Sequence, residues 1–273
     1  MNTDENLLFN EIVLLLAIAA FVLLLVLEGI KPHRSFARKE NKNSLVTNTE
    51  TFFFNNLILA TLRASSLFFI AQQLPHYGLL SGLDTGPVKW VLSFLLFDLA
   101  IYGWHFASHK YEFLWRFHKI HHSDKSFNVS TGLRFHVLDL TIELFYKCLL
   151  VILLGIDAYT ILAVESLELF FIFFHHSNLK FKNEESISKF IITPALHRTH
   201  HSTLRSEHDS NYGIVFAVWD KIFGTRKEDC VPDKIGLDLI EADNFIQLLF
   251  LAFITENQMK KIQQMIPRGK RSS

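Results

Sequence analysis

Ten of the fourteen histidines of this chain fall into four short clusters. They are His105, His109, His118, His121, His122, His175, His176, His197, His200 and His201. On an α-helix the positions i, i+3 and i+4 share one face. We therefore expect the HxxxH motif at 105–109 and the HxxHH motifs at 118–122 and 197–201 each to aim all their imidazoles in one direction. Because imidazole binds iron, zinc and copper well, the spacing predicts a metal centre.

The number of imidazoles indicates two metal ions, since one zinc ion takes about four ligands. Neutral imidazoles leave the positive charge of the ions in place, which favours an oxygen-activating dinuclear iron centre over a structural zinc site. A hydrolytic dinuclear zinc site normally includes carboxylates, but the nearest acids, Glu112 and Asp124, lack the spacing of the histidine motifs. Cys148 and Cys230 form no CxxC pair, so a thiolate site is not expected.

The composition is that of a protein partly buried in lipid. Hydrophobic residues make up 49% of the chain, and the mean hydropathy is +0.22. The 27 basic and 27 acidic residues balance, which argues against a nucleic-acid partner. Residues 12–27 form an unbroken apolar run, extended by residues 7–9, and this length predicts a retained membrane anchor without a signal-peptide cleavage site.

Further apolar stretches cover residues 52–74 and 88–106, and the segments 137–154 and 158–174 predict a helical hairpin around a turn at 155–157. Residues 31–42 contain five Lys or Arg, so this segment is expected to be cytoplasmic. When the predicted spans are traced from it, all four histidine clusters arrive at the same cytoplasmic face. The predicted class is an all-α, multi-span membrane protein whose cytosolic histidine-rich helical cap holds a dinuclear metal site.

Three regions are expected. Residues 1–87 hold the first membrane spans and the basic loop, 88–226 the metal domain, and 227–273 an interfacial helix near 245–254 with a basic tail. His33, His76 and His208 lie in other segments and are expected to be surface or ordinary hydrogen-bonded residues.

The histidines belong to longer motifs that resemble the fatty acid hydroxylase superfamily. In order, these are FDLAIYGWHFASH, LWRFHKIHHS, TGLRFH, HHSNL, TPALHRTHHS and NYGIVFAVWDKIFGT, spread over residues 91–225. The resemblance implies an integral membrane, non-haem di-iron oxidoreductase that uses oxygen and external electrons. It makes nine of the ten clustered histidines ligands, while relatives often have another residue at His175.

The same resemblance suggests residues that orient the ligand imidazoles through hydrogen bonds. These second-tier candidates are His136, Asp98, Asn178, Asn211, Tyr212 and Asp220. Relatives usually have Arg-x-His-Pro and then an acid, whereas here Val137 replaces the proline and Asp139 supplies the acid. Helix capping and turn formation remain the alternative roles for these side chains.

The predicted reaction is hydroxylation or desaturation of a lipid C–H bond, and the sequence does not separate sterol from fatty-acyl or alkyl substrates. The chain has no nucleotide, haem or iron–sulfur motif, so a ferredoxin, cytochrome or reductase must supply electrons. Arg116, Lys119 and Lys125 are candidate docking residues for an acidic carrier, and contact with phospholipid headgroups explains them equally well. The alternative is a metal-binding membrane protein, a transporter or a degenerate family member, without redox chemistry.

Glu165 and Glu168 lie within an apolar segment, where acids usually face a cavity or a partner. They are expected either to line the substrate channel, to hydrogen-bond the ligand histidines, or to lie on a wet polar face of a shallow hairpin.

Overall fold

The structure is a computed structural model that describes residues 3–61, 67–74, 77–228, 231–237, 244–255, 257–259 and 261. In these residues the chain is helical, with two isolated β-bridges and no strand, so the predicted all-α class is confirmed. The long helices are α1 (Thr3–Ile30), α2 (Arg38–Thr61), α4 (Pro87–Lys110), α6 (Val137–Leu154) and α7 (Ala158–His176).

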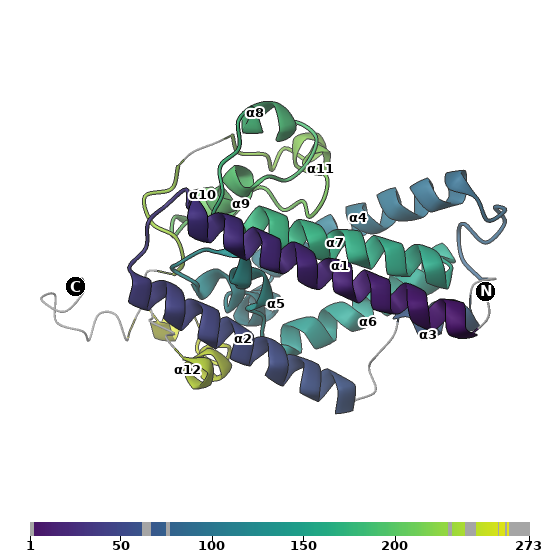
Figure 1. Cartoon of the computed structure of the whole chain (residues 1–273), viewed down its shortest axis with the longest axis horizontal. Coiled ribbons are helices and arrows are strands. Elements are labelled where there is room, and N and C mark those ends of the chain that lie inside the picture. The colour runs from purple at the N-terminus through teal and green to yellow at the C-terminus, as the bar shows by residue number, and fades with distance from the viewer. Residues whose placement is uncertain are drawn as a thin grey trace, which may run out of the picture.

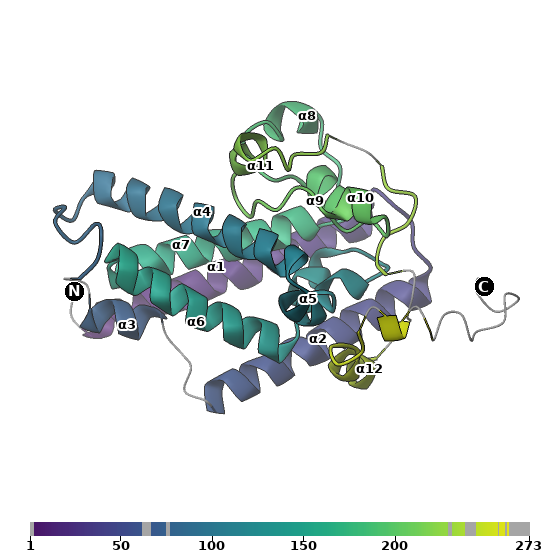
Figure 2. The same cartoon turned by 180° about the vertical axis from the view of Figure 1, so that it is seen from behind.

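Shorter segments connect the long helices. They are α3 (Leu67–Gln73), α5 (Glu112–His118), α8 (Glu184–Ile187), α9 (Pro194–His200), α10 (Arg205–His208), α11 (Val218–Ile222), α12 (Phe245–Leu251) and the 3-10 turns η1 (His121–Ser123) and η2 (Val129–Leu133). Figure 1 and Figure 2 show the long helices side by side, with α8 and α11 together above them on one side and α12 beside α2.

The main core joins α4, α6 and α7. Phe97, Ile101, Val151, Ile161 and Val164 are buried together there. Burying a side chain of this size stabilises the fold by about 1.5–3 kcal/mol, so these contacts hold the three helices in fixed register. Two of these helices, α4 and α7, end in the clustered histidines, and α6 begins close to the segment 118–122.

The predicted hairpin is confirmed, with α6 ending at Leu154 and α7 running two residues beyond the expected end, to His176. His136 caps the first turn of α6 by accepting a hydrogen bond from the backbone N–H of Leu138. Gly155 ends α6 at φ +69°, and a Cβ there would lie 2.6 Å from the carbonyl oxygen of Tyr77. Asp157 then caps α7 through the backbone N–H of Thr160.

The predicted second span at 52–74 is not found as one helix in the described residues, and residues 62–66 lie outside them. Helix α2 already begins at Arg38, so the expected basic loop is helical from that point, and α3 has only seven residues. Helix α2 begins earlier than the predicted span because one of its faces carries buried polar side chains. They are Ser44, Asn48, Thr51 and Asn55, at i+3 and i+4 spacing, and are called the polar stripe. This stripe faces the rest of the protein, so α2 is a packed helix with polar contacts.

In the described part of the chain, α4 and α7 are long and apolar enough to cross a membrane by length and composition, and Leu15–Ile30 is a shorter apolar helix. The number of spans and the side on which the histidines lie remain predictions.

Helix α12 covers part of the predicted interfacial segment, burying Leu248 and Leu251 against Phe117 and Ile120. The side chains of Ile246, Phe250 and Phe253 are exposed. The basic tail lies outside the described residues, except for Lys261.

Candidate metal centre

Nine of the ten clustered histidines fall into two groups whose ligand atoms lie within 4.8 Å of one another. The first group contains His105, His109, His118, His122 and His200, and the second contains His121, His176, His197 and His201. All nine are buried. The fold thus brings together residues from α4, α5, η1, α7 and α9 at two adjacent places where a metal ion could bind.

The prediction that each HxxHH motif aims all its imidazoles at one place is wrong. Helix α5 ends at His118, and the chain continues as a 3-10 turn, so His118 and His122 join the first group while His121 joins the second. The motif in α9 divides in the same way. Adjacent helical residues point about 100° apart, so neighbouring histidines serve different groups. Each HxxHH motif therefore ties the two groups together.

In the first group, two imidazoles have a defined tautomer. His105 Nδ1 donates to the carbonyl oxygen of Tyr212 at 2.8 Å, and His200 Nδ1 donates to that of Ser210 at 2.6 Å. A carbonyl only accepts, so the Nε2 atoms of both neutral rings carry lone pairs, yet they lie 3.0 Å apart. Nitrogens bound to one metal at about 2.1 Å and at right angles would also be about 3.0 Å apart. This geometry suits a shared cation.

In the second group, His176 Nδ1 donates to the carbonyl oxygen of Ile172 at 2.7 Å. Its Nε2 lies 2.9 Å from Nε2 of His121 and 2.9 Å from Nε2 of His197. The Nε2 atom of His201 is 3.2 Å from that of His197. Four Nε2 atoms therefore converge on one point, as the ligands of a single ion would.

Burial keeps these imidazoles neutral. Desolvation by burial, followed by repulsion from neighbouring histidines, lowers the pKa of His121, His122 and His201 well below 6.5. The same causes lower the pKa of His197 and His200. In the described residues, Nε2 of His118 and both ring nitrogens of His122 are buried without a hydrogen-bond partner. Neutral rings with unpartnered nitrogens fit metal ligation.

One supporting carboxylate escaped the sequence-based list. Asp139, at the start of α6, accepts a hydrogen bond from His118 Nδ1 at 3.1 Å. The acid that follows the Arg-x-His motif in relatives pointed to Asp139, but the sequence does not reveal which histidine this carboxylate hydrogen-bonds.

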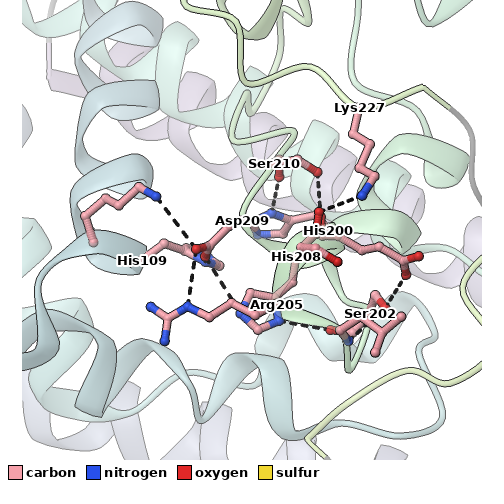
Figure 3. A network of polar contacts seen from close by, with 12 residues as sticks. His109, His200, Ser202, Arg205, His208, Asp209, Ser210 and Lys227 are labelled. Carbon is pink, nitrogen blue, oxygen red and sulfur yellow. Dashed lines mark hydrogen bonds and ion pairs between the residues drawn. The ribbon is translucent and has the colours of Figure 1, made fainter.

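A second carboxylate, Asp209, lies 3.6 Å from His109 Nδ1 and 3.7 Å from His208 Nε2, as Figure 3 shows. His208 is buried, and its Nδ1 donates to the carbonyl oxygen of Ser202 at 3.1 Å, as expected for a hydrogen-bonded residue. Its ring stacks on Trp115 with centroids 5.5 Å apart. Together His109, His208 and Asp209 form a third group of possible ligands.

Three second-tier candidates lie along one chain of contacts. Tyr212 holds His105 through its backbone carbonyl rather than its side chain. Asp220 accepts hydrogen bonds from the backbone N–H groups of Tyr212 and Gly213, so it fixes that carbonyl. Asp98 accepts from Trp219 Nε1 at 2.6 Å and from two backbone N–H groups of the same loop, at residues 215 and 216. Both acids act on the loop, not on an imidazole.

The other three candidates hold backbone around the site. His136 caps α6 and stacks on Phe117. Asn178 exchanges hydrogen bonds with the backbone of Arg34. Asn211, at φ +54°, bonds the backbone at residues 196 and 227. These hydrogen bonds do not reach a ligand imidazole, so capping and turn formation describe these three side chains.

The sequence left the role of His175 open, and Lys119 lies differently from expectation. His175 is buried but belongs to neither group, and its ring centroid is 3.9 Å from that of His197. Lys119 is buried and its Nζ donates to the carbonyl oxygen of Ile254, so it is not a docking residue. Lys125 is exposed and Arg116 half-buried.

A cavity of about 60 Å³ lies against both groups. Its lining includes His105 and His118 of the first group and His121, His176 and His197 of the second, together with His175. Ile101, Trp104 and Ile172 contribute apolar wall, and Glu143, Lys147 and Glu168 contribute polar wall. The arrangement can place a small part of a mostly apolar ligand beside the imidazoles.

A helical fold with two buried histidine groups defines a candidate metalloprotein. Residues 90–225 match the family model of fatty acid hydroxylase, and the chain belongs to this superfamily. It is 31% identical to alkylglycerol monooxygenase of Homo sapiens over 64% of this chain and 40% of that protein. It is 29% identical to an ornithine lipid hydroxylase of Rhizobium tropici over 62% of this chain and 52% of that protein. It is 30% identical to cholesterol 25-hydroxylase of Homo sapiens over 51% of this chain and 52% of that protein. The chain thus spans about half or less of these relatives, and no solved structure matches it.

Proposed function

We propose that this protein is a membrane-bound, oxygen-dependent oxidoreductase that hydroxylates a C–H bond of a lipid at a two-iron site. The observation that carries the proposal is the pair of buried, neutral histidine groups beside a small cavity. Membership of the fatty acid hydroxylase superfamily supports it. The names of the relatives, which include a monooxygenase and two hydroxylases, favour hydroxylation over desaturation.

The five histidines of the first group would hold one iron and the four of the second group the other. When bound, the irons would supply the activation of oxygen and the removal of hydrogen from an unactivated C–H bond. The protein's own part is to orient the imidazoles and to shape the cavity beside them. Carbonyls of Tyr212, Ser210 and Ile172 accept hydrogen bonds from Nδ1 so that Nε2 is available, and Ile101, Trp104 and Ile172 supply apolar wall for a lipid chain.

A lipid substrate is supported by the relatives, which are named for alkylglycerol, ornithine lipid and cholesterol. Substrate would reach the cavity from the bilayer, beside α4 and α7. The site would lie on the cytoplasmic face of a multi-pass protein, with the proposed metal domain at 88–226. Electrons would come from an external ferredoxin, cytochrome or reductase, with Arg116 and Lys125 as the remaining basic docking candidates.

The test is metal analysis of the detergent-purified protein, with Mössbauer spectroscopy after growth on iron-57. About two irons per chain in a coupled site, and a cellular lipid that gains oxygen on expression, are expected. Stoichiometric zinc that iron does not replace, or no bound metal, would contradict the proposal and favour a metal-binding protein without redox chemistry.

A further inference from the structure

A charged cluster lies in the wall of the cavity, on the helical hairpin. Lys147 of α6 is 3.3 Å from Glu143 on the same helix, 3.1 Å from Glu165 and 3.3 Å from Glu168 on α7. An ammonium group has three donor hydrogens. Lys147 donates hydrogen bonds to Glu165 and Glu168 and forms an ion pair with Glu143. The cluster carries two more negative than positive charges when all four groups are ionised.

Glu168 differs from the other two acids in its burial. Its side chain is 3% exposed, against 22% for Glu143 and 38% for Glu165, so the cluster runs from the protein surface to the cavity wall. Oxygen Oε2 of Glu168 accepts a hydrogen bond from Lys147, but Oε1 is buried with no partner in the described part of the chain. A buried carboxylate oxygen without a donor is costly, and native structures rarely tolerate one.

We propose that Glu168 determines substrate specificity by accepting, at Oε1, a hydrogen bond from a hydroxyl or amide N–H of the lipid. Glu168 lines the cavity, so a ligand bound there can reach Oε1, for which the described residues supply no donor. This inference rests on the proposed function only in taking a lipid as the ligand of this cavity.

The dimensions of the cavity limit where the donor lies in the lipid. About 60 Å³ of space for the centres of water-sized groups holds only a handful of heavy atoms, since about 10–15 Å³ of such space is needed for one water. Glu168 and the histidines line the same cavity, so the donor and the carbon nearest the histidines are separated by a few bonds. The excess negative charge of the cluster disfavours an anionic group here. The substrate class is therefore a lipid with a neutral or cationic donor close to its reacting carbon, not a free fatty acid whose carboxylate enters the cavity.

The test compares two probe lipids on the full-length purified protein, 1-O-hexadecylglycerol and its 2,3-di-O-methyl analogue, which lacks both donors. Binding is followed by tryptophan fluorescence, because Trp104 lines the cavity. We expect the wild-type protein to bind the free glycerol lipid about tenfold more tightly, as one buried hydrogen bond implies. Glu168→Leu should abolish this preference. If that variant does not fold, Glu168→Gln should reduce the preference about threefold, since an amide group keeps only one acceptor oxygen for both Lys147 and the ligand.

Glu165→Gln is the matched control, because Glu165 also pairs with Lys147 but does not line the cavity. It should keep the wild-type preference. Wild-type protein that binds both lipids equally, or binds neither, overturns the inference, and so does a Glu168 variant that keeps the preference. Metal content and product formation are measured separately. A protein that discriminates between the lipids but holds no iron would refute the proposed function alone, and a lipid hydroxylase that does not discriminate would refute this inference alone.

Discussion

The imidazoles of the candidate centre are held by two kinds of partner. Backbone carbonyls of Tyr212, Ser210 and Ile172 accept from three of them, whereas a carboxylate, Asp139, accepts from His118. A carboxylate makes the opposite ring nitrogen a stronger base than a carbonyl does. In the first group, the affinity of His118 for a metal would thus depend on the side chain of Asp139, which a substitution can change.

We expect Asp139→Asn to weaken metal binding at the first group by about 10- to 100-fold, the usual cost of removing such a partner. The measurement is competition against a chelator of known affinity. Asp209→Asn is the control, because Asp209 lies 3.6 Å from His109 Nδ1, compared with 3.1 Å between Asp139 and His118, and should lose less. Equal losses in the two variants would show that the hydrogen bond to His118 has no special role.

His175 and His176 are adjacent in sequence, but only His176 lies in a ligand group. His176→Asn should therefore remove about one metal ion per chain, while His175→Asn should keep the wild-type content, since each ion needs about four ligands. Metal per chain is measured on purified variants. Loss of metal from the His175 variant would make that residue a ligand and would require the second group to be redrawn.

At the scale of elements, the sequence predicted what depends on local patterns. The hairpin of α6 and α7 was readable because the turn at 155–157 and the apolar periodicity on both sides are local signals. The division of each HxxHH motif was not readable, because it depends on where α5 and α9 stop. The bounds of α2 were predicted wrongly for a related reason. Its polar side chains are buried because they hydrogen-bond Asp124 and Ser130, which are distant in sequence.

The turn of the hairpin offers a test of packing. Gly155→Ala should lower the thermal stability, because the residue has φ +69° and its new Cβ would approach the Tyr77 carbonyl oxygen to 2.6 Å. Gly103→Ala, on α4, meets nothing within 4 Å and should keep or raise the stability by up to about 1 kcal/mol through helix propensity. The melting temperatures of the two variants are compared in one detergent. Similar values would show that the backbone at Tyr77 does not pack on the hairpin turn.

At the scale of the whole molecule, residues outside the family match build part of the site's support. Glu28 of α1 accepts hydrogen bonds from the backbone N–H groups of Val129 and Asn178. Asn48 of α2 donates to Asp124. Burial alone would raise the pKa of Asp124, but the Arg134 guanidinium and several hydrogen bonds lower it, so this carboxylate stays ionised inside the protein. Helices α1 and α2 are therefore hydrogen-bonded to the segments that carry the histidines.

The burial of the histidines makes the stability of the protein depend on pH. The pKa values of His121, His122, His197, His200 and His201 are lowered well below 6.5, first by burial and then by neighbouring histidines. Below pH of about 6.5 the unfolded chain takes up protons that the folded chain does not, so the free energy of unfolding falls as the pH falls. Each histidine contributes at most about 1.4 kcal/mol per pH unit. Above this pH their contribution is fully present.

We therefore expect the melting temperature to be nearly constant from about pH 8 to pH 7 and to fall steeply below about pH 6.5. Protein as purified and protein treated with a chelator are compared. Bound metal requires neutral imidazoles, so metal-loaded protein should resist acid further than chelated protein, and metal release should accompany unfolding. A melting temperature that does not change between about pH 7 and pH 5 would mean that the histidines take up protons in the folded state, which their burial between α4, α7 and α9 opposes.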